Sequence, residues 1–118
     1  MNIHIQRVYD PPVKGGGPRF LVERLWPRGI KKEALHLTAW CKDAAPSTEL
    51  RRWFQHDPAK WPEFQRRYRA ELQQHPQPCA TLLQAARRGP ITLLYSAKDT
   101  EHNSAVVLRN WMEENLRA

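Results

Sequence analysis

The segment after the last predicted strand carries the densest group of side chains that could do chemistry. Ser96 supplies a hydroxyl, Lys98 a point charge, and His102 a group that titrates near neutral pH. Asp99 could cap a helix, orient His102 or bind a metal. Ligands of open α/β sheets bind beyond the carboxyl ends of strands, and a helix N-terminus attracts anions, so this segment is a candidate anion site. In the competing interpretation Asp99 or Thr100 only caps the helix, and Lys98 and His102 lie on the surface.

The same segment holds the candidate catalytic residues Ser96, Lys98, Asp99 and His102. Ser96 has no GxSxG elbow around it, and closeness in sequence does not establish the hydrogen bonds of a Ser96–His102–Asp99 triad. Whether the chain is an enzyme or a binding protein therefore stays open. We expect the following helix to begin within residues 100–103.

A second basic segment follows another apolar strand. Arg24 and Arg28 carry planar guanidinium groups that bind phosphate or carboxylate through paired hydrogen bonds, and Trp26 could stack on a base or sugar. If the two strands are parallel neighbours, these side chains lie near Ser96 and Lys98. Three alternatives compete: the acidic residue before Arg24 pairs with an arginine, Trp26 packs in the core, or the basic run is a solvated loop.

The elements that must position these residues follow from apolar periodicity and turn residues. Helices are expected from the Ser47 cap to about residue 54, from the Asp57 cap to about residue 74, around residues 82–88, and at the C-terminal end. Apolar runs predict strands over residues 2–8, 20–25, 91–95 and, less clearly, 37–41. The fold class is therefore α/β: a small single-domain sheet with at least two parallel-type core strands (about 20–25 and 91–95), covered by helices. The strand order is left open.

Length and composition set the remaining bounds. The 118 residues suit one domain, 1–118, and no apolar stretch approaches the roughly 20 residues of a membrane span. The first residues lack the apolar run of a signal peptide, so a cytoplasmic location is expected. Cys41 and Cys79 form no CxxC pair and are expected to be ordinary thiols, and no motif calls for a metal or a cofactor.

The net charge of +7 favours anionic partners, although solvated helix faces would also produce it. We expect the chain to bind or act on a small anionic ligand, phosphorylated or nucleotide-like, at the carboxyl ends of the strands. A basic nucleic-acid-binding or regulatory module is the less favoured alternative, and a protein-interaction domain without ligand is a third. No membrane partner is expected, and the oligomeric state is left open.

Several segments together resemble the small bacterial YeaO-like proteins, a branch of a family known as a domain of unknown function. The resemblance covers nearly the whole chain and is carried by Arg7-Val8-Tyr9-Asp10, by residues 21–32 with the distinctive run Leu25-Trp26-Pro27-Arg28-Gly29-Ile30-Lys31-Lys32, by residues 46–51 and by residues 93–99. It implies an α/β domain without an established activity. It also implies that Arg24, Trp26, Arg28, Lys98 and Asn103 are signature positions, without assigning them roles.

One position departs from the family pattern. Similar proteins often read Asn-His-Ala at the start of the last helix, whereas this chain reads Asn103-Ser104-Ala105. A role for histidine at this place would have to pass to His102. The central helices are cut by prolines and contain no compact helix-turn-helix unit, which argues against a transcriptional regulator of that type.

Overall fold

A four-stranded, all-parallel sheet forms the centre of the computed structural model, which describes residues 2–117. The strands are β1 (Ile3–Arg7), β2 (Arg19–Leu21), β3 (Ala39–Trp40) and β4 (Ile91–Tyr95), in the order β1-β4-β2-β3. The fully buried β4 lies between β1 and β2, so the last strand in sequence is central in space. The predicted α/β class and its two parallel core strands are thus confirmed.

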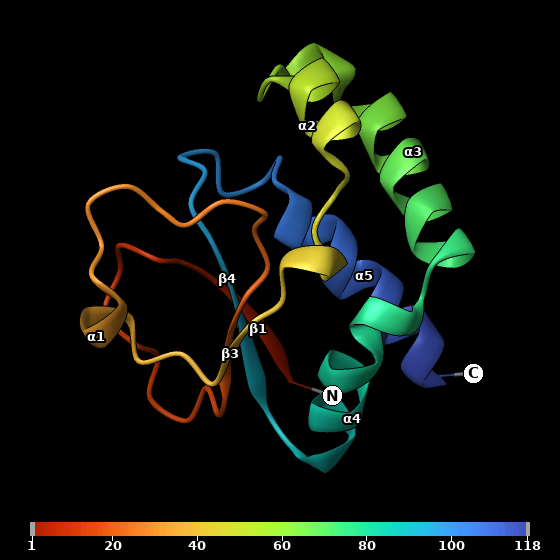
Figure 1. The fold of residues 1–118 in the computed structure, drawn as a ribbon. Coiled ribbons are helices and arrows are strands. Elements are labelled where there is room, and N and C mark those ends of the chain that lie inside the picture. The colour runs from red at the N-terminus through yellow and green to blue at the C-terminus, as the bar shows by residue number, and fades with distance from the viewer. Residues whose placement is uncertain (1, 118) are drawn as a thin grey trace.

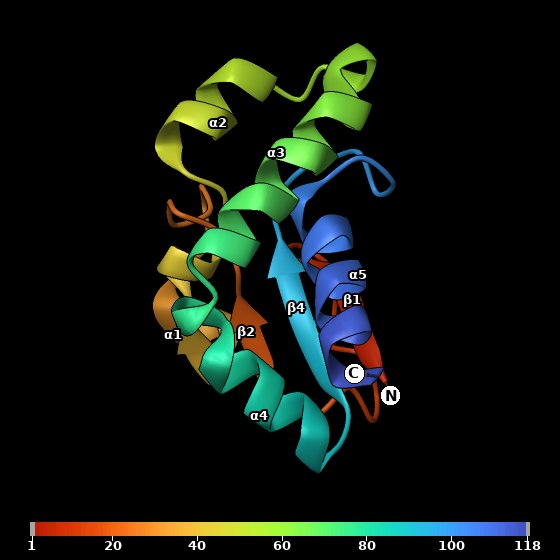
Figure 2. The same cartoon turned by 90° about the vertical axis from the view of Figure 1, so that its right-hand side faces the viewer.

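The helices lie mainly on one side of this sheet. Figures 1 and 2 show α3, α4 and α5 along one face, α1 on the opposite side, and α2 beyond the end toward which β4 points. The helices are α1 (Lys32–Leu35), α2 (Thr48–Phe54), α3 (Trp61–Gln74), α4 (Ala80–Arg88) and α5 (Ser104–Arg117), with 3-10 turns at Lys42–Ala44, Pro58–Lys60 and Gln77–Cys79. Ser47 caps α2, as its position predicted, whereas Asp57 caps the second of these 3-10 turns and the α-helix predicted to follow it directly begins at Trp61.

Alternation along the strands divides the apolar side chains between two faces. In β4, Ile91, Leu93 and Tyr95 join the large core under α3, α4 and α5. Leu94 instead joins Leu21 in a smaller core on the side of α1. This division explains why β4 is apolar at almost every position, since both of its faces are covered.

β3 covers only Ala39–Trp40 of the expected residues 37–41, and two boundaries at the carboxyl end of the sheet also differ from the predicted ones. β2 was expected to reach residue 25, but it pairs with β4 only as far as Leu21, with one further hydrogen bond from Val22 N to Leu94 O. The helix expected to begin within residues 100–103 begins at Ser104, because the Asn103 side chain accepts a hydrogen bond from Val106 N at 3.2 Å. Both differences lengthen the loops at the carboxyl end of the sheet.

The buried face of α3 supplies a stability prediction. The Tyr68 hydroxyl is buried and donates a hydrogen bond to Ala44 O at 2.5 Å. Tyr68→Phe leaves that carbonyl without its partner and should lower the free energy of unfolding by about 1–2 kcal/mol in urea denaturation. Tyr95→Phe is the comparison variant, because Tyr95 is also a buried residue but its less enclosed hydroxyl has no hydrogen-bond partner among residues 2–117. Equal losses in the two variants would contradict the assigned role of the Tyr68 hydroxyl.

Candidate functional site

A pocket of about 320 Å³ opens at the carboxyl ends of three neighbouring strands. Tyr9 reaches it from the chain after β1, residues 23–28 from the chain after β2, and Ser96 and Ala97 from the chain after β4. The remaining walls come from α2 and its end, α3 and the start of α5: Arg51, Phe54, His56, Phe64, Asn103 and Ser104. The pocket therefore lies where parallel α/β sheets bind ligands.

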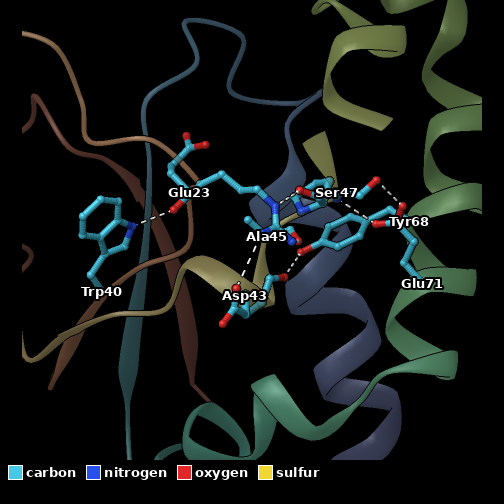
Figure 3. Close-up of polar contacts among 10 residues, drawn as sticks. Glu23, Trp40, Asp43, Ala45, Ser47, Tyr68 and Glu71 are labelled. Atoms are coloured by element: carbon cyan, nitrogen blue, oxygen red, sulfur yellow. Dashed lines mark hydrogen bonds and ion pairs between the residues drawn. The ribbon is translucent and has the colours of Figure 1, made fainter. Parts of the chain in front are cut away.

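Arg24 forms part of the pocket wall and also joins two distant segments. Its Nε donates to Pro46 O at 2.8 Å, its Nη2 to Ala45 O at 3.4 Å, and its Nη1 lies 3.5 Å from Asp43 Oδ1. These contacts join the chain after β2 to the segment before α2, of which Figure 3 labels Asp43 and Ala45. Most of the guanidinium is thus occupied by the protein, so Arg24 positions α2 as well as lining the pocket.

A second contact fixes the start of α2. The Ser47 N–H and hydroxyl donate to the two Glu71 carboxylate oxygens at 2.9 and 2.6 Å (Figure 3). Ser47 Oγ also accepts a hydrogen bond from Leu50 N. The Glu71 carboxylate of α3 is thus turned toward Ser47. α2 is therefore attached to α3 at its first turn.

Glu23 connects the two loops that the sequence singled out. Its Oε1 accepts hydrogen bonds from Ser96 N at 2.7 Å and Ser96 Oγ at 2.9 Å. Its main-chain carbonyl accepts from Trp40 Nε1 at 2.6 Å. The Ser96 hydroxyl is thus held by a carboxylate, and Glu23 pairs with the serine rather than with an arginine.

Trp26 and Arg28 occupy different environments within the same loop. The Trp26 ring packs edge-on against Trp40 with centroids 5.4 Å apart, and its Nε1 donates to Ile30 O. Trp26 therefore shapes the loop while bordering the pocket. Arg28 is exposed, and its carbonyl accepts a hydrogen bond from the Tyr9 hydroxyl at 3.1 Å. Its guanidinium has no partner among residues 2–117 and is free to contact a ligand.

Arg51 lines the pocket but was not singled out from the sequence, because basic residues on helices are expected on solvated faces. It lies three residues before Phe54 on the same side of α2, a spacing that could have revealed it. Its Nε is buried without a hydrogen-bond partner in the described chain. An unpaired buried donor is costly to the fold, and Arg19 Nε is in the same state outside the pocket.

His56 was also missed. Gln55 and His56 both adopt left-handed backbone conformations, with φ of 48° and 56°, directly after α2. Non-glycine residues rarely adopt this conformation, and two in succession turn the chain sharply at the pocket rim. The turn brings His56 to the pocket, where its ring lies 6.1 Å from that of Phe54.

The remaining predicted residues lie outside this lining. Lys98 is exposed. Asp99 Oδ2 lies 2.9 Å from His102 Nδ1, and the His102 ring packs edge-on against Trp61. Because the Ser96 hydroxyl binds Glu23, no Ser96–His102 hydrogen bond forms among the described residues. Five of the predicted residues therefore line one pocket: Arg24, Trp26, Arg28, Ser96 and Asn103. The other three, Lys98, Asp99 and His102, do not line it.

The Asp99 turn should respond to acid. Hydrogen bonds from the backbone N–H groups of Glu101 and His102, followed by that of the His102 ring, lower the pKa of Asp99 from its ordinary 3.8. A lowered folded-state pKa contributes stability above the ordinary value, and this stability is lost as pH falls through the folded value. An NMR titration should therefore give an Asp99 midpoint below 3.8, with the Glu101 amide signal moving in parallel. Asp99→Asn should abolish that amide response, and a midpoint at or above 3.8 would contradict the turn.

The two cysteine thiols are less suited to chemistry than the pocket residues. Burial raises the pKa of Cys41, and raises that of Cys79 to about 11, so both thiols disfavour the reactive thiolate. Within residues 2–117 no group of three or more His, Cys, Asp or Glu side chains is arranged to hold a metal ion. In the same part of the chain, no helix has the length and apolar character needed to cross a membrane.

This geometry defines the class of protein: a parallel α/β domain with an arginine-lined pocket at the carboxyl ends of its strands. The chain belongs to the DUF488-N3i family, described as the inactive DUF488-N3 subclade, whose model matches residues 2–118. It is 50% identical over 112 residues to the "uncharacterized protein YeaO" of Escherichia coli K12, covering 95% of this chain and 97% of that protein. It is 37% identical over 106 residues to the uncharacterized proteins Mb3100c of Mycobacterium bovis and Rv3073c of Mycobacterium tuberculosis, covering 90% of this chain and 89% of each of them. No solved structure gives a significant match.

Proposed function

We propose that this protein binds a small phosphorylated or nucleotide-like anion in the pocket at the carboxyl end of the sheet. The observation that carries the proposal is the set of three arginines, Arg24, Arg28 and Arg51, in the wall of the pocket at the strand ends. A phosphate or carboxylate group would accept hydrogen bonds from guanidinium groups of this wall and balance their charge.

The charge balance of the pocket supports an anion. Its charged lining consists of Arg24, Arg28 and Arg51 against Glu23, with His56 at the rim. Arg24 is largely occupied by carbonyl groups, so Arg28 and Arg51 are the two arginines available to a ligand. Two guanidinium groups on different walls suit a dianionic phosphate group.

Binding is favoured over catalysis. The Ser96 hydroxyl donates to a carboxylate, and the Asp99–His102 pair lies outside the pocket lining. The family description as an inactive subclade agrees with a binding role. The protein would then act by sensing or carrying its ligand.

A thermal-shift screen tests this function. The probes are inorganic phosphate, ribose 5-phosphate, adenosine monophosphate and a short single-stranded DNA, each at low and moderate salt. A probe at ~100 times its dissociation constant adds about 2.7 kcal/mol of stability, which raises the melting temperature by several degrees. We expect a shift from a phosphorylated small molecule that is smaller in Arg28→Ala and retained in Lys98→Ala, since Arg28 lines the pocket and Lys98 does not.

Two results would overturn the proposal. A shift produced only by DNA and lost at moderate salt would favour the nucleic-acid-binding alternative, which the +7 charge supports. Equal losses in Arg28→Ala and Lys98→Ala would show that binding follows overall charge and not the pocket.

A further inference from the structure

We propose that Glu23 makes the pocket selective for phosphorylated ligands that also carry hydroxyl groups, the chemistry of sugar phosphates. This inference rests on the proposed function, because it concerns the same pocket. It assigns to Glu23 the recognition of a ligand's hydroxyl group, separate from the arginines that would hold the phosphate.

The Glu23 carboxylate is held in place by one oxygen only. Oε1 accepts both hydrogen bonds from Ser96, whereas Oε2 has no hydrogen-bond or ion-pair partner among residues 2–117. The side chain is half-buried and lines the pocket. Figure 3 shows the carboxylate projecting away from Trp40. An acceptor that is fixed at one oxygen and open at the other is pre-organised for a donor from the ligand.

The charge of Glu23 makes this donor necessary. A carboxylate in a pocket for anions repels a phosphate, and it can only accept hydrogen bonds. A ligand with oxygen acceptors alone would displace water from Oε2 and leave that atom without a partner. A hydroxyl group donates to it, so hydroxylated phosphates gain affinity and bare phosphates lose it.

The pocket walls agree with a sugar phosphate rather than a zwitterion such as an amino acid. An ammonium group could also donate to Oε2, but the two available guanidinium groups of Arg28 and Arg51 exceed the single charge of Glu23 and favour a ligand with net negative charge. Phe54 and Phe64 also line the pocket and stack with centroids 4.1 Å apart. Their apolar surface provides a dry wall for the carbon skeleton of the ligand.

Isothermal titration calorimetry with three probes tests the inference: ribose 5-phosphate, n-pentyl phosphate and inorganic phosphate. The first two are phosphate monoesters with five carbons and differ in their hydroxyl groups. We expect the wild-type protein to bind ribose 5-phosphate at least tenfold more tightly than n-pentyl phosphate. In Glu23→Gln, which keeps an oxygen acceptor for Ser96 and removes the charge, this ratio should fall to about threefold or less, while n-pentyl phosphate binds as tightly as before or more tightly.

The possible outcomes distinguish a failure of the Glu23 inference from a failure of the proposed function. Equal binding of the two monoesters to the wild-type protein would overturn the role of Glu23 and leave the phosphate pocket intact, as would an unchanged preference in Glu23→Gln. No binding of any probe would overturn both. If Glu23→Gln fails to fold, the comparison of the two monoesters on the wild-type protein still decides the selectivity. A second variant, Ser96→Ala, removes the hydroxyl that holds Glu23 Oε1 and should reduce the tenfold preference for ribose 5-phosphate.

Discussion

Replacing Arg51 by methionine is expected to weaken the binding of a phosphorylated ligand about 10- to 100-fold while leaving the melting temperature unchanged or raised. A hydrogen bond to a charged group contributes about 1.5–3 kcal/mol, which corresponds to this loss of affinity. Methionine keeps the apolar stem of the side chain and removes the buried, unpaired Nε. The free protein therefore loses an unsatisfied group and gains stability.

The combination of these two effects distinguishes a ligand-binding arginine from a structural one. Calorimetry with ribose 5-phosphate measures the affinity, and a thermal melt without ligand measures the stability. Arg52→Met is the matched control, because Arg52 is the exposed neighbour on the same helix and should change neither value. A clear fall in the melting temperature of Arg51→Met with unchanged affinity would assign Arg51 to the fold.

The largest effect on stability is expected from Gly17→Ala. Gly17 has a φ of +68°, and a Cβ atom placed on it would lie 1.9 Å from Pro90 O and 2.8 Å from Pro90 C. The clash involves backbone at the start of the central strand, where Thr92 N bonds to Pro18 O and the Thr92 hydroxyl bonds to Gly16 O. The strand cannot move without breaking these bonds, so we expect a loss of about 3 kcal/mol or more, read as a fall of roughly 10 °C in the melting temperature.

Gly15→Ala separates the clash from the backbone conformation. Gly15 has a similar φ of +76°, but nothing lies within 4 Å of a Cβ atom there. Its substitution should cost only about 1 kcal/mol for the left-handed conformation. A similar loss in both variants would show that the close approach to Pro90 contributes nothing to the fold.

Local sequence patterns predicted most of the elements because their signals act over a few residues. Apolar periodicity predicted the helix that ends near residue 74, whose buried face consists of Phe64, Tyr68 and Leu72, and Ser47 identified the start of α2. The continuous apolar run of residues 91–95 predicted a strand that is covered on both faces. The parallel pairing with the strand near residue 20 followed from the helices between them and is confirmed.

By itself, then, the sequence determined the α/β class, the parallel core strands, the helix caps and the two loops that meet at the strand ends. Only the tertiary structure decided the strand order and which side chains of those loops face the pocket. Arg51 enters it because Arg24 contacts Pro46 and Glu71 binds Ser47, contacts between segments more than 20 residues apart that no local periodicity encodes. Lys98 lies outside the pocket because the next residue, Asp99, forms a turn of its own. Asn103, and not Asp99, caps α5. Hydrogen bonds of this kind depend on distances in space, and these exist only once the helices have packed on the sheet.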